Sequence, residues 1–152
     1  MFNLKIIAIG KIKNKSLFDL EKDYQQRLKP FSKIKIEELK PEIFSKFNKE
    51  KAKKIESEKI KSVLSKHLYE NIFLLDEKGE EFDSTSFAEF LDKKQNLIFV
   101  IAGALGFSDE LKKEYKKISL SRLTFPHEMA RVILLEQIYR AVTIINKKEY
   151  HY

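Results

Sequence analysis

Residues Leu97 to Gly106 read LIFVIAGALG, and residues Ser119 to Tyr152 read SLSRLTFPHEMARVILLEQIYRAVTIINKKEYHY. The first stretch is an apolar run that ends in a turn with two glycines, which is typical of a buried strand followed by a tight connection. The second stretch holds a further short strand, a Pro-His junction, a long apolar helix and an aromatic tail. Together the two stretches predict a cofactor pocket beside a basic rim that can handle protons.

Strands and helices alternate along the rest of the chain. The expected strands are Leu4–Ile9, Ile34–Leu39, Ile72–Leu75, Leu97–Ala102 and Ile118–Phe125. The expected helices are Ser16–Leu28, Asn48–His67, a helix capped by Ser84 or Thr85 that ends at Leu91, Ser108–Lys117 and His127–Ile145, with a turn at Glu77–Glu80. Apolar strands separated by helices form parallel sheets covered on both faces. We therefore expect an α/β fold, a mostly parallel sheet with helices on both faces, in a single domain over residues 1–152.

Ligands of parallel α/β sheets bind outside the carboxyl ends of the strands. Three strand ends are therefore candidate positions for a site: Leu75-Asp76, Ala102–Gly106 and Leu123–Pro126. Gly103 and Gly106 allow close approach of a ligand, but a plain turn needs glycine as well, and the loop matches neither G-x-G-x-x-G nor a Walker A motif. The extended segment before Pro126 can offer its backbone to an adenine edge, or it is an edge strand that ends at a proline.

The last helix is apolar over more than one face, which indicates that it is buried or forms a subunit interface. Glu136 and Arg140 lie four residues apart, so a structural ion pair is the default interpretation of both. The tail Tyr150-His151-Tyr152 is either frayed or able to stack on bases and move a proton.

Charge is distributed unevenly along the chain. Residues 1–66 hold 18 Lys/Arg and 9 Asp/Glu, a balance of +9, whereas residues 67–152 hold 12 and 14, a balance of −2. The first half is thus the expected face for a polyanion such as RNA, although lysine-rich helices are often only solvated. We expect no metal site, because there is no cysteine and the three histidines are scattered. We also expect a cytoplasmic protein, without signal peptide or membrane span.

Several separated motifs resemble the pseudouridine N3-methyltransferases of large-subunit ribosomal RNA, a family of the SPOUT superfamily. They are Phe99-Val100-Ile101-Ala102-Gly103-x-x-Gly106-Phe107, Ser119-Leu120-Ser121-x-Leu123-Thr124-Phe125-Pro126-His127, Arg131-Val132-x-Leu134-x-Glu136-Gln137-x-Tyr139-Arg140-Ala141 and Tyr150-His151. The N-terminal Ile6-x-Ala8-Ile9-Gly10-Lys11 is also similar. The resemblance covers essentially the whole chain, and motifs in the same order are more specific than any one of them.

The resemblance implies a SPOUT-type domain with a C-terminal trefoil knot, a homodimer, and S-adenosyl-L-methionine held by the knot. The implied reaction is methylation of N3 of a pseudouridine in the large-subunit (23S) rRNA of an assembled ribosome. The implied cofactor-binding residues are Leu75, Ala102, Gly103, Gly106, Leu120, Ser121, Arg122, Leu123, Thr124 and Phe125. Within this hypothesis, His127 and His151 are the catalytic candidates for the N3 proton, and Arg131 or Arg140 for a phosphate or a developing anion.

The chain departs from the family pattern at two positions. Ala102 stands where the family usually has the first glycine of a pair, and Tyr152 follows Tyr-His where a basic residue is common. These departures leave open an alternative function, an RNA- or ribosome-binding factor that keeps the fold without catalysis. A measurement of affinity for S-adenosyl-L-methionine would distinguish the methyltransferase from the factor without catalysis. A third interpretation is a flavodoxin-like regulatory domain with Asp76 as its strand-end carboxylate, but Gly10-Lys11 replaces the acidic pair that such a domain has after its first strand.

Overall fold

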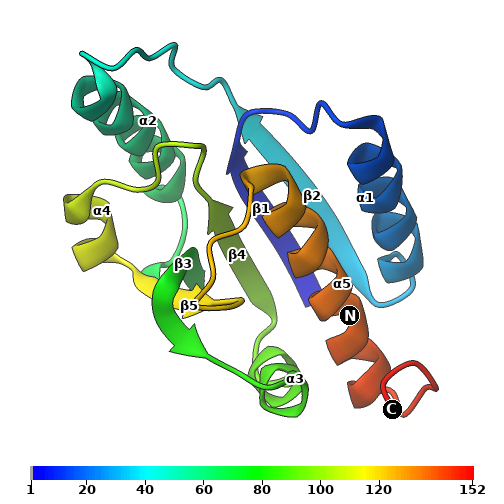
Figure 1. Cartoon of the computed structure of the whole chain (residues 1–152). Coiled ribbons are helices and arrows are strands. Elements are labelled where there is room, and N and C mark those ends of the chain that lie inside the picture. The colour runs from blue at the N-terminus through cyan, green and yellow to red at the C-terminus, as the bar shows by residue number, and fades with distance from the viewer. Residues whose placement is uncertain (1) are drawn as a thin grey trace.

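The strands of the sheet run parallel to one another in the computed structural model, which describes residues 2–152 (Figure 1). The strands are β1 (Phe2–Ile9), β2 (Ser32–Leu39), β3 (Ile72–Glu81), β4 (Asn96–Ile101) and β5 (Lys116–Ser119), in the order β2-β1-β4-β3-β5. The helices are α1 (Lys15–Leu28), α2 (Lys49–Leu64), the 3₁₀ turn η1 (Tyr69–Asn71), α3 (Ser84–Asp92), α4 (Asp109–Glu114) and α5 (His127–Ile145). The predicted α/β fold class is confirmed.

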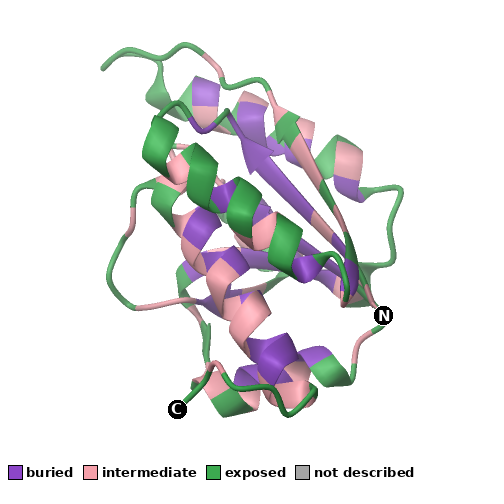
Figure 2. Ribbon diagram, turned by 90° about the vertical axis from the view of Figure 1, so that its right-hand side faces the viewer, coloured by how far each residue is buried: buried purple, intermediate pink, exposed green. Residues whose placement is uncertain are grey.

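Alternation along the central strands builds two cores. In β1, Leu4, Ile6 and Ala8 pack on one face of the sheet with α1, α3 and α5, whereas Ile7 and Ile9 pack on the other face with α2 and α4. Successive side chains of a strand point to opposite faces, so an unbroken apolar run fills both cores. Figure 2 shows the buried sheet between helices whose outer faces are exposed.

Two helices begin at residues that the sequence prediction missed. The Asn14 side chain accepts the backbone N–H of Leu17 at 3.1 Å, so Asn14 caps α1 in place of the expected Ser16. Asp83 caps α3, where its carboxylate accepts the N–H of Ser86 and the Ser86 hydroxyl accepts the N–H of Asp83. Both caps satisfy amide groups that the first helical turn leaves free.

The C-terminal part of the sheet differs most from the prediction. β3 continues through the expected turn at Glu77–Glu80, because its register with β5 shifts between Leu75 and Glu80 and β5 pairs with both parts of the strand. β5 begins earlier than expected and ends at Ser119, so the prediction of a strand up to Phe125 was wrong. α4 ends at Glu114 and α2 at Leu64, which makes both helices shorter than expected. The trefoil knot stays a prediction.

Within residues 2–152, no helix combines the length and the apolar character that crossing a bilayer would require.

Candidate active site

A cavity of about 780 Å³ lies at the carboxyl ends of β3, β4 and β5, and we call it the strand-end cavity. Its walls come from the three strand ends that the sequence singled out. The lining residues are Lys53, Leu75, Asp76, Glu77, Ile101, Ala102, Gly103, Ala104, Leu105, Gly106, Phe107, Lys112, Leu120, Ser121, Leu123, Thr124, Phe125, Pro126, His127 and Ala130. Segments far apart in sequence thus build one site, as expected for a parallel sheet.

The glycine loop forms one wall of this cavity, and its two glycines are required for different reasons. Gly106 has a φ of +74° and donates its N–H to the carbonyl of Gly103 at 3.1 Å, so it closes a turn that L-residues rarely adopt. Gly103 is required by space, since an added Cβ would lie 2.9 Å from Cγ2 of Ile9 and 3.5 Å from Oε1 of Glu56. The loop therefore lies directly against the sheet and α2.

Leu120–Phe125 forms a second wall as an irregular segment outside the sheet. The Ser119 hydroxyl donates to the carbonyl of Ser121 at 2.9 Å, and the Ser121 hydroxyl accepts the N–H of Leu123 at 3.0 Å. These serines hold the segment in shape without a strand partner. Because a backbone outside a sheet makes no ladder hydrogen bonds, the amides and carbonyls of this segment other than the Ser121 carbonyl and the Leu123 N–H are available for a ligand.

Charged side chains complete the cavity. Asp76 is buried, accepts the N–H of Lys78 at 2.8 Å and lies 3.5 Å from the ammonium of Lys112. Lys53 reaches the cavity from α2. Sequence reasoning missed both lysines, because a lysine on a charged helix carries no local signal that distinguishes it from its neighbours. The cavity therefore offers both a carboxylate and ammonium groups to a polar ligand.

Glu56 is a third residue that sequence reasoning missed. It is 3% exposed, and one carboxylate oxygen accepts the N–H of Glu42 at 2.9 Å. The other oxygen has no hydrogen-bond partner among residues 2–152 and faces the position above Gly103. Glu56 thus lies directly behind the glycine loop.

His127 is the first residue of α5, as predicted, and its side chain lines the cavity. The next residue holds it in place. The carboxylate of Glu128 accepts the backbone N–H groups of Lys13 at 2.6 Å and Asn14 at 3.0 Å, and these hydrogen bonds hold the pKa of Glu128 below its ordinary value. The start of α5 is therefore tied to the loop that follows β1.

Arg131 does not line the strand-end cavity. Its side chain is 1% exposed, and its guanidinium donates to Glu38 at 2.7 Å, Glu21 at 3.3 Å and the carbonyl of Gly10 at 3.0 Å. Burial raises the pKa of Glu21, and Arg131 opposes that shift. Arg131 thus belongs to a buried ion-pair network that joins α5 to α1 and β2. This network lies outside the cavity in which a catalytic role was predicted for Arg131.

His151 also lies away from the cavity of its own chain. It follows the far end of α5, where its Nδ1 is 3.3 Å from the Arg140 guanidinium. Arg140 pairs with Glu136, as expected, and the Tyr150 hydroxyl donates to the same carboxylate at 3.2 Å. The Tyr150 ring packs against Tyr139 at 4.8 Å, and burial raises the pKa of Tyr150. These contacts hold Tyr150, whereas Tyr152 is fully exposed.

Arg122 is the one predicted cofactor residue that does not line the cavity. Its side chain is largely exposed and pairs with Glu81 at 3.3 Å. The other nine predicted positions, all but Arg122 of the ten, line the cavity together.

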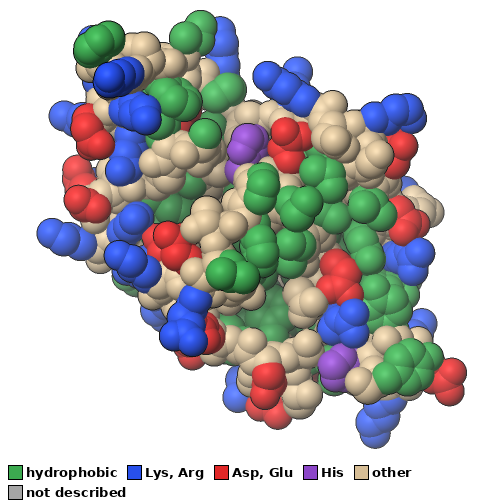
Figure 3. Space-filling view, in the orientation of Figure 1, with side chains coloured by type: hydrophobic (Ala, Val, Ile, Leu, Met, Phe, Trp, Pro, Cys, Tyr) green, Lys and Arg blue, Asp and Glu red, His purple; other side chains and the backbone are tan. Residues whose placement is uncertain are grey.

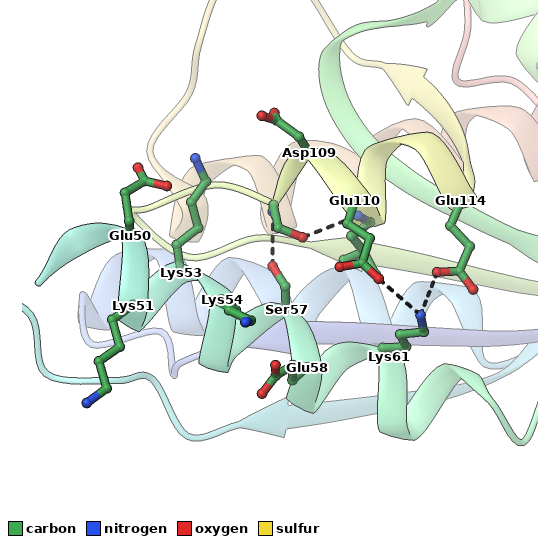
Figure 4. Close-up of a pocket in the computed structure, with 12 residues that line it drawn as sticks. Glu50, Lys51, Lys53, Lys54, Ser57, Glu58, Lys61, Asp109, Glu110 and Glu114 are labelled. Atoms are coloured by element: carbon green, nitrogen blue, oxygen red, sulfur yellow. Dashed lines mark hydrogen bonds and ion pairs between the residues drawn. The ribbon is translucent and has the colours of Figure 1, made fainter.

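A second cavity of about 650 Å³ lies between α2 and α4 and contains none of the predicted site residues (Figure 4). Lys61 bridges Glu110 at 3.5 Å and Glu114 at 3.0 Å, and the Ser57 hydroxyl accepts the N–H of Ser108 at 3.0 Å. These contacts join the two helices. We therefore interpret the second cavity as part of the packing of α2 against α4 and not as a ligand site. Within residues 2–152, no group of three or more His, Cys, Asp or Glu side chains is placed to hold a metal ion.

A parallel α/β sheet with a glycine loop and an irregular segment at its strand ends is typical of proteins that bind a small ligand at that edge. The chain belongs to the SPOUT methyltransferases, because residues 2–151 match the family model described as "Predicted SPOUT methyltransferase". This finding confirms the expected superfamily.

Full-length relatives agree with the family assignment. The chain is 43% identical over 156 residues to a protein of Kosmotoga olearia, and the alignment covers 99% of each of the two chains. It is 42% identical over 158 residues to a protein of Flavobacterium johnsoniae, again with 99% of both covered, and 37% identical over 161 residues to one of Desulfitobacterium hafniense. Each of these relatives is named ribosomal RNA large subunit methyltransferase H.

Proposed function

We propose that this chain transfers a methyl group from S-adenosyl-L-methionine to N3 of a pseudouridine in the large-subunit (23S) rRNA. In this proposal it acts as a cytoplasmic homodimer on the assembled ribosome. The observation that carries the proposal is the strand-end cavity, where nine of the ten expected cofactor positions, all but Arg122, meet around one space. The names of the full-length relatives support rRNA as the substrate.

The residues of the cavity suit this cofactor. Its volume of about 780 Å³ lies within the range of small-molecule sites. The backbone of Leu120–Phe125 can bind an adenine edge. In the glycine loop, a Cβ on Gly106 would meet no atom of the described residues within 4 Å, so this position leaves room for a ligand. Asp76 can accept hydrogen bonds from hydroxyl or ammonium groups, whereas Lys53 and Lys112 can bind a carboxylate. When bound, the cofactor would supply an electrophilic methyl group on a sulfonium.

The protein's own part in this reaction is positioning and proton transfer. Holding the two reactants in line contributes about 7–11 kcal/mol to such reactions. N3 must lose its proton to act as a nucleophile, and His127 at the cavity is the candidate base, worth roughly 10²–10⁴-fold in rate.

His151 enters the proposal through the second subunit. It lies beyond the far end of α5 from its own cavity, so a catalytic role for it requires a tail supplied by a partner chain. The outer side of α5 is suited to such an interface, since Met129 is 41% exposed and hydrophobic side chains gather along this helix (Figure 3). The dimer and the composite site are therefore proposed together.

Transfer of a labelled methyl group tests the proposed function. The substrates are ribosomes that lack the modification and free 23S rRNA, and calorimetry measures cofactor binding in parallel. We expect micromolar binding of S-adenosyl-L-methionine and label in large-subunit rRNA, with ribosomes preferred over free RNA. Absence of both binding and label would contradict the proposal and favour a ribosome-binding factor without catalysis.

A further inference from the structure

The connection between β2 and α2 exposes three large apolar side chains within five residues. Ile43 is 92% exposed, Phe47 93% and Phe44 40%. Single exposed apolar residues are common on protein surfaces, but a cluster of this kind marks an interaction site. Two of the three are aromatic, and aromatic rings are the side chains on which unpaired bases stack.

Hydrogen bonds hold this connection in a defined shape. At its start, Lys59 donates to the carbonyl of Lys40 at 3.0 Å, and the N–H of Glu42 donates to the buried Glu56. At its end, the Ser45 hydroxyl donates to the Asn48 side chain at 3.3 Å. The backbone is thus tied at both ends while the apolar side chains between the ties face solvent. Ordered display of apolar groups reduces the entropy that binding would cost.

Lysines surround the apolar cluster. Residues 40–54 contain six lysines and two glutamates, a balance of +4. In Figure 4, Lys51 and Lys53 leave the first turns of α2 toward different sides. Figure 3 shows hydrophobic side chains beside lysines over the connection, at the upper left. Aromatic rings interleaved with ammonium groups fit a polyanion with exposed bases better than they fit the apolar surface of another protein.

The surface lies at the same edge of the sheet as the strand-end cavity. β2 is parallel to β1 and β1 to β4, so the connection leaves the sheet at the carboxyl edge, where the cavity lies. Lys53 belongs to the lysine group and also lines the cavity. A nucleic-acid strand whose target base enters the cavity can therefore continue onto this surface.

We propose that Phe44 and Phe47 stack on unpaired nucleotides of the rRNA next to the target base, while the lysines around them, Lys46, Lys49 and Lys51, contact the phosphates. This inference rests on the proposed function, because it takes rRNA as the substrate, and it names the surface that binds the RNA beyond the cavity.

Substitution of the two rings tests the inference. In Phe44→Ala/Phe47→Ala we expect KM for the ribosomal substrate to rise about tenfold or more, with kcat, cofactor affinity and melting temperature unchanged. Lys46→Ala/Lys49→Ala should weaken ribosome binding. The slope of the logarithm of the binding constant against the logarithm of the salt concentration should fall by about two, one for each lost phosphate contact. Leu68→Ala and Lys66→Ala are matched controls. Leu68 and Lys66 are an exposed apolar and an exposed basic side chain just before β3, at the amino edge of the sheet and away from the proposed RNA surface.

An unchanged KM in the phenylalanine variant, with wild-type enzyme active, would overturn the inference and leave the proposed function intact. Sedimentation of the protein with ribosomes gives a second readout that does not require methylation. If the wild type fails to methylate but the variant still loses RNA binding, the inference stands and the proposed function fails.

A photoreactive phenylalanine at position 47 identifies the occupant directly. Crosslinks to rRNA support the inference. Crosslinks confined to a ribosomal protein, or to a second copy of this chain, would overturn it.

Discussion

His127 begins α5, whereas His151 follows the helix in sequence and contacts Arg140, 13 residues or about 20 Å further along α5. Only His127 lines the strand-end cavity. The two candidate bases cannot serve the same cavity within one chain. If both act in catalysis, a dimer must bring the tail of one chain to the cavity of the other.

Mixing two inactive variants tests this composite site. We expect His127→Ala and His151→Ala each to lose most single-turnover activity as homodimers. A mixed dimer contains one cavity with an intact His127 and an intact His151, so random mixing should restore about a quarter of the wild-type activity. The measurement is methyl transfer after the two variants are unfolded and refolded together.

No recovery on mixing, with dimers confirmed by light scattering, would contradict the composite site. Near-normal rates in both single variants would remove the histidine base from the mechanism.

Arg131 is predicted to act on stability through its buried network. Arg131→Met should destabilise the fold by about 3–5 kcal/mol, because it leaves the carboxylates of Glu21 and Glu38 without their cationic partner. Glu21→Gln in the same chain should recover part of that loss, since a neutral amide is less costly to bury. Denaturant unfolding gives the free energies.

The double variant also separates the two roles considered for this arginine. We expect its methyl-transfer rate at low temperature to remain within a few-fold of the Glu21→Gln single variant. A folded double variant that binds the cofactor but does not transfer the methyl group would instead support a catalytic role for Arg131.

The close packing of Gly103 predicts a specific defect in the glycine loop. Gly103→Ala should cost about 1–3 kcal/mol, because its Cβ would lie 2.9 Å from Cγ2 of the β-branched Ile9. Displacement of the loop should weaken cofactor binding about tenfold or more, measured by calorimetry. Ala102→Gly removes a Cβ from the same loop instead of adding one, so it creates no clash and should bind the cofactor at least as tightly as the wild type. Equal affinities of Gly103→Ala and wild type would contradict the predicted effect of this loop on cofactor binding.

The hydrogen bonds to the carboxylate of Glu128 predict that the stability of the fold depends on pH. Hydrogen bonds from Asn14 and Lys13 lower its folded-state pKa below the value of 4.5 in the unfolded chain. Its contribution is therefore present above about pH 4.5 and is lost as the pH falls through the folded-state pKa. Glu128→Gln should be less stable than wild type by about 1 kcal/mol near neutral pH, and the difference should shrink in acid.

The control for this experiment is Glu89→Gln on the exposed side of α3, which should change stability little at either pH. A difference between Glu128→Gln and wild type that stays constant down to about pH 3 would contradict the assigned hydrogen bonds.

The sequence predicted those features that depend on local pattern. Apolar runs identified the three central strands, and the Pro-His junction located the start of α5 at His127. Features that depend on partners distant in the chain were missed. The length of β3 depends on pairing with β5, more than 30 residues later, and the burial of Arg131 depends on Glu21 and Glu38.

The candidate site follows the same division. The glycine loop and Leu120–Phe125 were predictable because strand ends at one edge of a parallel sheet must meet. The sequence did not predict three charged residues beside the site, Lys53, Lys112 and Glu56. Only the packing of α2 and α4 against the sheet shows which charged side chains of these helices face the cavity or the glycine loop.

The identity of the methylated nucleoside tests the central claim most directly. Ribosomes with and without pseudouridine at the target are incubated with the protein and labelled S-adenosyl-L-methionine, and the rRNA is digested and separated by chromatography. We expect the label in N3-methylpseudouridine, and only in ribosomes that contain the pseudouridine. Label in another nucleoside, or equal label without pseudouridine, would contradict the account.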